Sequence, residues 1–451
     1  MTDGITQKLN RGSIPELVFR IAAFLLGLFS TMPIVGIVVK GRDISFFKIF
    51  FAAWVVVLGL RLLRTRRFAL LKRNRLLNLW LLIGLIGCVS GALFLRGEVA
   101  EFGQAALSYI PKVALLLLFS LVWSVDEKAD ACAEIVVKGF LWGCALNCMW
   151  ASIDAFGFYI TGKSLHNTVF YGYSTRHGID YNTMSLIYKG TIRAGGFNSD
   201  PAQLGFVAPV LFGYGISRKH ILPMALAVCG IAASASTTGL VTAGILFFLL
   251  MRKRDPRPLK DKLSRLQIAE LLVFCVGVGV LLLWQGERIL ALAGNMIARF
   301  VSRIQSEYLN NGGPDIRVRY VLQAFGAMRA VLPFMLFGSG FGTASLGYVI
   351  TPEVMAVIGP GHDFAYDMEN TYLAYFFDTG ILGLAVFLLL MAFLWMRYRK
   401  QYAERESAFS DYIYVTLSSI LLSMLFYHYI LFAPQMLVIT LALSRLGNNQ
   451  G

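Results

Sequence analysis

The sequence predicts an all-α integral membrane protein with about twelve transmembrane helices. Hydrophobic residues make up 57% of the 451 residues and charged residues only 15%, and the mean hydropathy is +0.64. A chain of this composition cannot cover its own surface with polar groups, so a water-soluble globule is excluded. Apolar runs of about 17–25 residues recur along the chain, as membrane helices require. They do not alternate apolar with polar residues, as transmembrane β-strands do.

Twelve apolar segments are expected to cross the membrane. They are 20–39, 46–63, 76–95, 106–124, 133–159, 203–217, 221–236, 238–251, 267–284, 371–396, 410–427 and 429–444. Two long polar segments, 160–202 and 285–370, separate them within a single transmembrane domain. The sixth to eighth spans are short and contain glycine and proline. Such spans are typical of helices that line a cavity.

The basic residues predict the orientation of these spans. They gather in three connectors, 61–75, 252–265 and 397–405. All three lie on the cytoplasmic side if both termini are cytoplasmic, as the positive-inside rule requires. Only the short connector at Asp126-Glu127-Lys128 disagrees, and acidic residues count for little in this rule. The N-terminus lacks a small-residue cleavage site, so we interpret it as the start of the first span rather than a signal peptide.

The net charge of +15 is therefore interpreted as a topology signal rather than as a nucleic-acid-binding surface. The two long polar segments then face the opposite compartment, which in a bacterium is the periplasm. No nucleotide sugar is available there, so any activity must use a donor that is already activated and carried on a lipid. The six cysteines lie in or beside apolar runs, and we expect them to pack in the core.

The first polar cluster with chemical potential is Thr191 to Pro201, directly before the sixth span. Arg193 offers a planar guanidinium suited to phosphate oxygens. Gly195-Gly196 permits close approach of the backbone to a ligand. The alternative is a turn whose arginine reaches toward lipid headgroups.

A second cluster, in the larger polar segment, begins at Asp315 and contains Arg317 and Arg319. Two arginines two residues apart cannot share one helix face, so one is expected to address a ligand while the other pairs elsewhere. A glycine-rich stretch at 338–342 follows, without the Lys-Ser/Thr of a nucleotide loop, and is interpreted as a tight re-entry turn. Upstream, the apolar spacing over 289–304 predicts an amphipathic helix on the outer membrane surface.

The third cluster, His362 to Asn370, lies at the entrance to the tenth span. Glu369 stands where the chain enters the apolar phase, so desolvation should raise its pKa toward the range useful for a general base. His362 is the other candidate base. Glu369 and Asn370 are also suited to capping the helix N-terminus, and the two roles are compatible.

The ordered set of these motifs resembles the O-antigen ligase and polymerase superfamily of bacterial membrane glycosyltransferases. The set is Arg193-Ala194-Gly195-Gly196, then Arg317 and Arg319 before a Pro…Gly-x-Gly turn, then Asn370-Thr371-Tyr372-Leu373 with Gly380-Ile381-Leu382-Gly383. The resemblance covers roughly 190–385. It implies a GT-C-like architecture in the inner membrane, undecaprenyl-diphosphate-linked glycans as substrates and no metal or other cofactor.

The resemblance also implies roles for individual residues. Arg193, Arg317 and Arg319 would hold the diphosphate, and Glu369 or His362, next to Asn370, would act as the base. The ligase branch has histidine directly before the asparagine, where this chain has Glu369. That difference favours a polymerase of lipid-linked repeat units, with transfer to lipid A core as the alternative. A length-regulating partner and transfer to protein both stay open.

A flippase or other transporter of lipid-linked sugars would also have about twelve spans. Transporters place titratable residues near the middle of the membrane and are built from internal repeats. In this chain the arginines and acidic residues concentrate in the external loops, and no repeat is evident. The sequence therefore favours an enzyme over a transporter.

Overall fold

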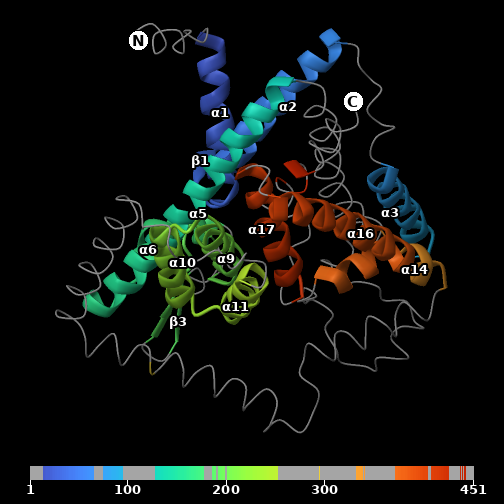
Figure 1. The fold of residues 1–451 in the computed structure, drawn as a ribbon. Helices are drawn as coiled ribbons and strands as arrows, with labels where there is room; N and C mark the ends of the chain where they lie inside the picture. Colours follow the sequence, from blue (N-terminus) through green and yellow to red (C-terminus); the bar gives the residue numbers. More distant parts are fainter. Residues whose placement is uncertain are drawn as a thin grey trace, which may run out of the picture.

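The computed structural model describes more than half of the chain, and within it helices predominate (Figure 1). The described residues are 14–65, 75–94, 127–176, 185–188, 191–198, 201–251, 294, 332–338, 340, 371–404, 408–425, 437, 439, 441 and 442. The amphipathic helix predicted over 289–304 lies outside this set except for Gly294. Apart from Gly294, the larger polar segment, 285–370, is described at 332–338 and at Gly340.

The helices are α1 (Ile14–Ser30), α2 (Phe46–Thr65), α3 (Arg75–Phe94), α5 (Glu127–Thr161), α6 (Leu165–Val169), α7 (Tyr171–Arg176), α9 (Pro201–Arg218), α10 (Ile221–Ser234), α11 (Thr237–Met251), α14 (Leu332–Phe337), α16 (Thr371–Glu404) and α17 (Ala408–Ser423). Two antiparallel hairpins accompany them in the described residues, β1 (Gly36–Val39) with β2 (Arg42–Ser45) and β3 (Leu186–Tyr188) with β4 (Thr191–Arg193).

Nine of the twelve expected spans coincide with described helices. The spans expected at 106–124 and 267–284 lie outside the described residues, and the last is described at only four positions. By length and composition, Ala133–Thr161 and Thr371–Glu404 are long and apolar enough to cross a membrane. The mostly helical structure agrees with an all-α membrane protein, and the number twelve stays a prediction.

The first expected span, 20–39, is wrong at its end. Helix α1 stops at Ser30, and residues 36–45 form a hairpin. Pro33 cannot continue the helix, and the run Ile37-Val38-Val39 is β-branched, which favours strand geometry. Lys40 and Gly41 both have positive φ, 49° and 76°, as the two central residues of a tight hairpin turn require. Hydropathy alone cannot distinguish this strand from helix.

Helix α1 packs against α5 through glycines. An added Cβ at Gly27 would overlap the backbone of Val136, and one at Gly139 would overlap the carbonyl of Phe24. Gly139 and Gly143 are four residues apart, which is the small-residue spacing that lets membrane helices approach closely. Their neighbours on α1 advance in the same direction along the chain, so the two helices are parallel.

Helices α9, α10 and α11 form a second group, drawn in green in Figure 1. They are short, with 18, 14 and 15 residues. Gly205 of α9 faces Ser236 at the start of α11, where an added Cβ would overlap the serine hydroxyl. The short lengths agree with the sequence prediction, and the cavity that these spans were expected to line stays a prediction.

Helix α17 is almost entirely buried among the described helices. It lies between α5 and α9 on one side and α16 on the other. Tyr412 packs edge-on against Phe140 of α5 at 5.7 Å between ring centroids, and Val415 lies against Gly213 of α9. On its other side, the Trp395 indole of α16 donates a 2.9 Å hydrogen bond to the Ser418 hydroxyl. The core therefore runs from α5 and α9 through α17 to α16.

The cysteine prediction is confirmed for two residues and wrong for a third. Cys144 and Cys148 are buried in the core on α5, and Cys88 is half-buried. Cys229 of α10 is exposed, on a helix surface that carries other exposed apolar side chains such as Val228. Cys88, Cys144, Cys148 and Cys229, the cysteines whose side chains the structure describes, are free thiols.

Candidate functional site

Arg193, the first predicted diphosphate ligand, is held against the end of α10. Its Nε donates a 3.2 Å hydrogen bond to the carbonyl of Ser234, the last residue of that helix. The next amide, Ala194 N, donates to the Ala233 carbonyl at 2.9 Å. The guanidinium is half-buried. Both contacts place Arg193 beside the turn that joins α10 to α11.

Asn147 of α5 fixes the chain immediately after Arg193. Its Nδ2 donates to the Thr31 carbonyl at 2.9 Å and to the Gly143 carbonyl at 3.0 Å. Its Oδ1 accepts from the Phe197 amide at 2.8 Å and from Asn198 Nδ2 at 3.0 Å. The side chain is fully buried. One amide group therefore joins the end of α1, the middle of α5 and the segment 194–198. This segment directly follows Arg193 and is called the Arg193 segment below.

The two glycines of the Arg193 segment were expected to admit a ligand. Gly196 has φ +68°, and a Cβ there would lie 2.8 Å from Asn147 Oδ1. The backbone thus approaches closely, but what it approaches is the protein's own amide. Gly195 donates its N–H to the Ser185 hydroxyl at 3.2 Å. In the described chain these glycines serve the internal packing of the segment.

A buried carboxylate, Asp154, organises the surrounding loop. Its Oδ1 accepts from the Ser164 hydroxyl and from the His166 amide, both at 2.9 Å. Its Oδ2 accepts from the Ser185 hydroxyl at 2.7 Å, which in turn accepts from Gly195. Asp154, Ser164 and Ser185 are each buried to within 2%. A buried carboxylate is tolerated because donors satisfy both oxygens.

His166 lies in the same network with its ring neutral. Its Nδ1 accepts a 3.2 Å hydrogen bond from the Trp150 indole, so the proton sits on Nε2. Burial lowers the pKa of His166 to about 4, against the opposing effects of Asp154 and of the Asn198 backbone, which raise it. The Trp150 ring stacks on Phe197 at 5.2 Å. A neutral imidazole therefore supports the Arg193 segment at physiological pH.

The glycines at the end of α14 bring its backbone into contact with that of α16 near Asp378. Gly338 and Gly340, at the end of α14, have φ of 80° and 114°. A Cβ at Gly338 would overlap the backbone of Asp378, and Gly340 N donates to the Asp378 carbonyl at 3.0 Å. Gly87 of α3 packs against the same point. The predicted tight turn is confirmed at the two glycines that the structure describes.

Helix α16 is broken at this contact, which the sequence prediction of a continuous span 371–396 missed. Gly380 has φ 68° and ψ −174°, outside helical geometry. The rings of Tyr375 and Phe387 lie 4.4 Å apart although twelve residues separate them, so the two halves meet at a sharp angle. Residues 371–379 form a short, mostly buried half-helix, and 381–404 form the longer helix.

The start of the half-helix is anchored to the end of α17. Thr371 N donates to the Met424 carbonyl at 3.0 Å, and the Tyr372 hydroxyl donates to the Leu421 carbonyl at 2.8 Å. Thr371 is fully buried. The first turn of α16 is therefore held against the end of α17.

Of the six predicted site residues, the structure describes Arg193. The other five, His362, Glu369, Asn370, Arg317 and Arg319, lie outside the described residues. Their convergence with Arg193 stays a prediction. Among the residues that the structure describes, no group of three or more histidine, cysteine, aspartate or glutamate side chains is placed to hold a metal ion.

A family comparison bears on this arrangement. Residues 222–388 match the family model described as O-antigen ligase, from the first turn of α10 past the break in α16. This match supports the assignment to the O-antigen ligase and polymerase superfamily. The match confirms the resemblance drawn from the motifs. No curated protein matches the chain significantly.

Members of this superfamily are integral-membrane, glycosyltransferase-like enzymes that act on lipid-linked glycans, and the apolar helices agree with this class. The O-antigen ligase match contains five of the six predicted site residues, together with Gly338, Gly340 and Gly380. Arg193 and its supporting network precede the matched residues.

Sequence reasoning missed Asn147 and Asp154. Both are polar residues inside an otherwise apolar helix, and polar side chains at membrane depth are costly unless they have partners. The cost of polar side chains at membrane depth was therefore the sequence signal for both residues. Their partners lie on α1 and in the loop 164–198, far away in sequence, and hydropathy carries no information about such pairs.

Proposed function

We propose that the protein is a polymerase that joins undecaprenyl-diphosphate-linked oligosaccharide repeat units into a surface polysaccharide, O-antigen or exopolysaccharide. The O-antigen ligase match carries the proposal at the level of the superfamily. Glu369, at the position where the ligase branch has histidine, favours the polymerase. Its acceptor would be a second lipid-linked glycan.

We further propose that the active site faces the periplasm and that both termini are cytoplasmic. Contacts between distant segments support this topology. Arg218 pairs with Asp411 at 3.0 Å, and the Tyr398 hydroxyl donates to the Ala442 carbonyl, all at ends expected in the cytoplasm. The bonds that join Ala194 to Ala233 and Thr371 to Met424 connect ends expected in the periplasm.

The proposed chemistry is a single displacement at the anomeric carbon. Glu369 or His362 takes the proton from an acceptor hydroxyl, whose oxygen forms the new glycosidic bond as the bond to the diphosphate breaks. Undecaprenyl diphosphate leaves with the bonding electron pair, and the anomeric centre is inverted. Arg193 with Arg317 or Arg319 stabilises the charge that develops on the diphosphate, without a metal.

The single most direct test is substitution of the arginines, followed by analysis of polymer length in cells. We expect Arg193→Ala and Arg317→Ala to lower polymer formation on the order of 100-fold or more. Lys163→Ala is the matched control, since this exposed cation lies in the same polar segment, 160–202. Normal polymer in both Arg193→Ala and Arg317→Ala cells would overturn the assignment.

The ligase alternative is favoured by the description of the matching family. A deletion strain separates the two. Loss of a polymerase leaves single repeat units on lipid A core, whereas loss of a ligase leaves full-length polymer on the lipid carrier. A flippase would instead leave unprocessed repeat units on the cytoplasmic side. A purified protein that elongates a defined undecaprenyl-diphosphate glycan would identify the polymerase and show whether a length-regulating partner is needed.

A further inference from the structure

The hairpin between α1 and α2 has two chemically different faces. Its register pairs Ile37 with Ile44 and Val39 with Arg42 on one face, and Val38 with Asp43 on the other. The first face is an aliphatic patch that ends in an arginine, and it is called the aliphatic face below. The second face contains the carboxylate.

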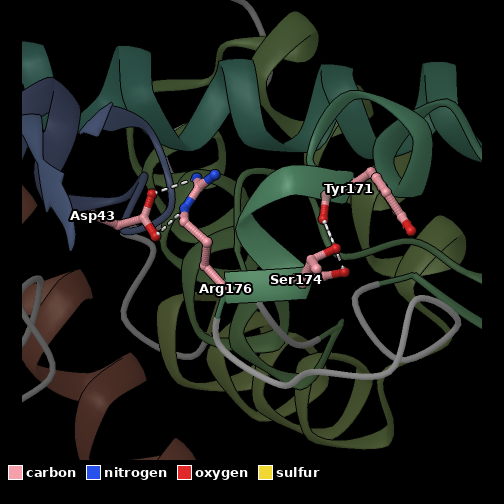
Figure 2. Close-up of polar contacts among 5 residues, drawn as sticks. Asp43, Tyr171, Ser174 and Arg176 are labelled. Atoms are coloured by element: carbon pink, nitrogen blue, oxygen red, sulfur yellow. Dashed lines mark hydrogen bonds and ion pairs between the residues drawn. The ribbon is translucent and has the colours of Figure 1, made fainter. Parts of the chain in front are cut away.

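The Asp43 carboxylate on the second face is bound to protein. Asp43 Oδ2 accepts from Arg176 Nε at 2.9 Å, and Oδ1 accepts from Nη2 at 2.6 Å, so the pair is bidentate (Figure 2). Arg176 is the last residue of α7. This two-point contact fixes the rotation of the hairpin about its own axis.

The aliphatic face is exposed. Ile37 and Val39 are 44% and 42% exposed, and Ile44 is half-buried. The base of the hairpin is rigid, because Phe46 N donates to the Val35 carbonyl at 2.9 Å and Phe29 stacks on Phe50. A rigid patch of β-branched side chains is unfavourable in water.

The surroundings of the hairpin identify what covers this face. Helix α1 ends at Ser30 and α2 begins at Phe46, and both carry exposed aliphatic side chains such as Ile21 and Val56. Both coincide with expected spans, so the hairpin begins where the bilayer ends. A two-stranded hairpin leaves unpaired backbone groups on its outer edges, which hydrocarbon would not satisfy. Its place is therefore the headgroup interface, where water reaches those edges.

The charge of the hairpin fits the same environment. Lys40 and Arg42 are exposed at its tip, and Lys48 is exposed on the first turn of α2. Apolar side chains flanked by cations are typical of segments that lie in the membrane interface and contact anionic headgroups.

We propose that the aliphatic face of the β1–β2 hairpin lies against the phospholipid interface of the leaflet at which α1 ends, and that Arg42 and Lys40 bind lipid phosphates there. The Asp43–Arg176 pair then transmits this fixed position to α7 and to the loop that contains the Arg193 segment. The inference concerns membrane contact and does not depend on which glycan reaction the protein performs.

The test is spin-label accessibility on the full chain in nanodiscs of phosphatidylethanolamine and phosphatidylglycerol. Single labels are placed by Ile37→Cys, Val38→Cys and Val39→Cys, in a chain whose six native cysteines are replaced by alanine. Val38 is the matched control, because it is 51% exposed and lies on the opposite face. We expect collisions with oxygen to exceed those with a water-soluble nickel chelate at positions 37 and 39, and the reverse at 38.

Equal preference for the nickel chelate at all three positions would overturn the proposal, because the aliphatic face would then be in water. Protection from both reagents at positions 37 and 39 would also overturn it, since another protein surface would then cover the face. Exchanging phosphatidylglycerol for phosphatidylcholine should move the label at 39 toward water, and Arg42→Gln should remove that dependence on the anionic lipid. An unchanged dependence in Arg42→Gln would contradict the role of Arg42.

Discussion

The Arg193 segment and the contact between α14 and α16 are held in opposite ways. The first is fixed by side chains, since Asn147, Asp154 and Ser185 hydrogen-bond its backbone or its neighbours. The second is fixed by the lack of side chains, because Gly338 and Gly380 allow two backbones to touch. Hydrogen bonds of buried polar groups respond to pH and to single-atom changes, whereas glycine contacts respond only to volume. The two regions should therefore fail under different perturbations.

The largest effect is expected for Gly380→Ala. The new methyl group would overlap the backbone of Leu336, and the residue would keep a positive φ of 68° that disfavours any side chain. Strain and overpacking together should cost about 4 kcal/mol of folding free energy. Thermal unfolding in detergent measures it. Gly157→Ala on α5 is the control, since nothing lies within 4 Å of its added Cβ. Equal melting temperatures for the two variants would show that the backbone contact does not hold α16.

A smaller but still large loss is expected for Asn147→Leu. The substitution keeps the branching of the side chain but leaves the Phe197 amide and the Thr31 carbonyl without their buried partner. The expected cost is about 3 kcal/mol. Ser152→Ala on the same helix, which removes a bond to the Cys148 carbonyl one turn away, should cost no more than about 0.5 kcal/mol. Equal losses of stability for Asn147→Leu and Ser152→Ala would contradict the clamp.

Acid should weaken the Arg193 segment and leave the glycine contact unaffected. The pKa of His166 is lowered from its ordinary 6.5 to about 4 by burial, so folding favours the neutral ring. Its contribution is fully present above pH 6.5 and is lost as the pH falls toward 4. At about pH 5 the loss should approach 2 kcal/mol. The melting temperatures of the wild type and of His166→Gln, compared between neutral and acidic buffer, isolate this contribution. A drop of the same size in both proteins would assign the acid sensitivity to groups other than His166.

The smallest effect is expected for Asp43→Asn. The carboxylate raises the pKa of Arg176 through their hydrogen bond, but the arginine is solvent-exposed and the pair is screened. We expect a slight loss of thermal stability that disappears in high salt. A loss that persists in high salt would mean that the pair acts through packing rather than through charge.

Much of the fold was predictable from hydropathy, because long apolar runs mark helices wherever they occur. The elements that hydropathy missed are those in which apolar residues adopt another geometry. Ile37-Val38-Val39 is apolar but forms a strand, and the stretch around Gly380 is apolar but broken, since hydropathy does not report φ. The order of the motifs along the chain identified the superfamily. That order is visible in the residue types and requires no knowledge of distances in the fold.

The candidate site was predictable only in part. The glycine-rich stretch 338–342 was interpreted as a tight turn, and its two described glycines, Gly338 and Gly340, have the positive φ that such a turn allows. The close neighbour of Gly196 is Asn147, and no local sequence pattern identifies that partner. Asn147 itself joins residues 31 and 197, and no local pattern connects positions that far apart.

The parallel pairing of α1 with α5 has a consequence for biosynthesis. Helix α5, the partner of α1, is made roughly a hundred residues later. The surface of α1 around Gly27 is therefore uncovered when α1 first enters the membrane. Nascent chains arrested before α5 should thus expose α1 to lipid or to an insertion chaperone, and those arrested after it should not. Helix α1 is thus inserted before the helix that covers its glycine surface has been made.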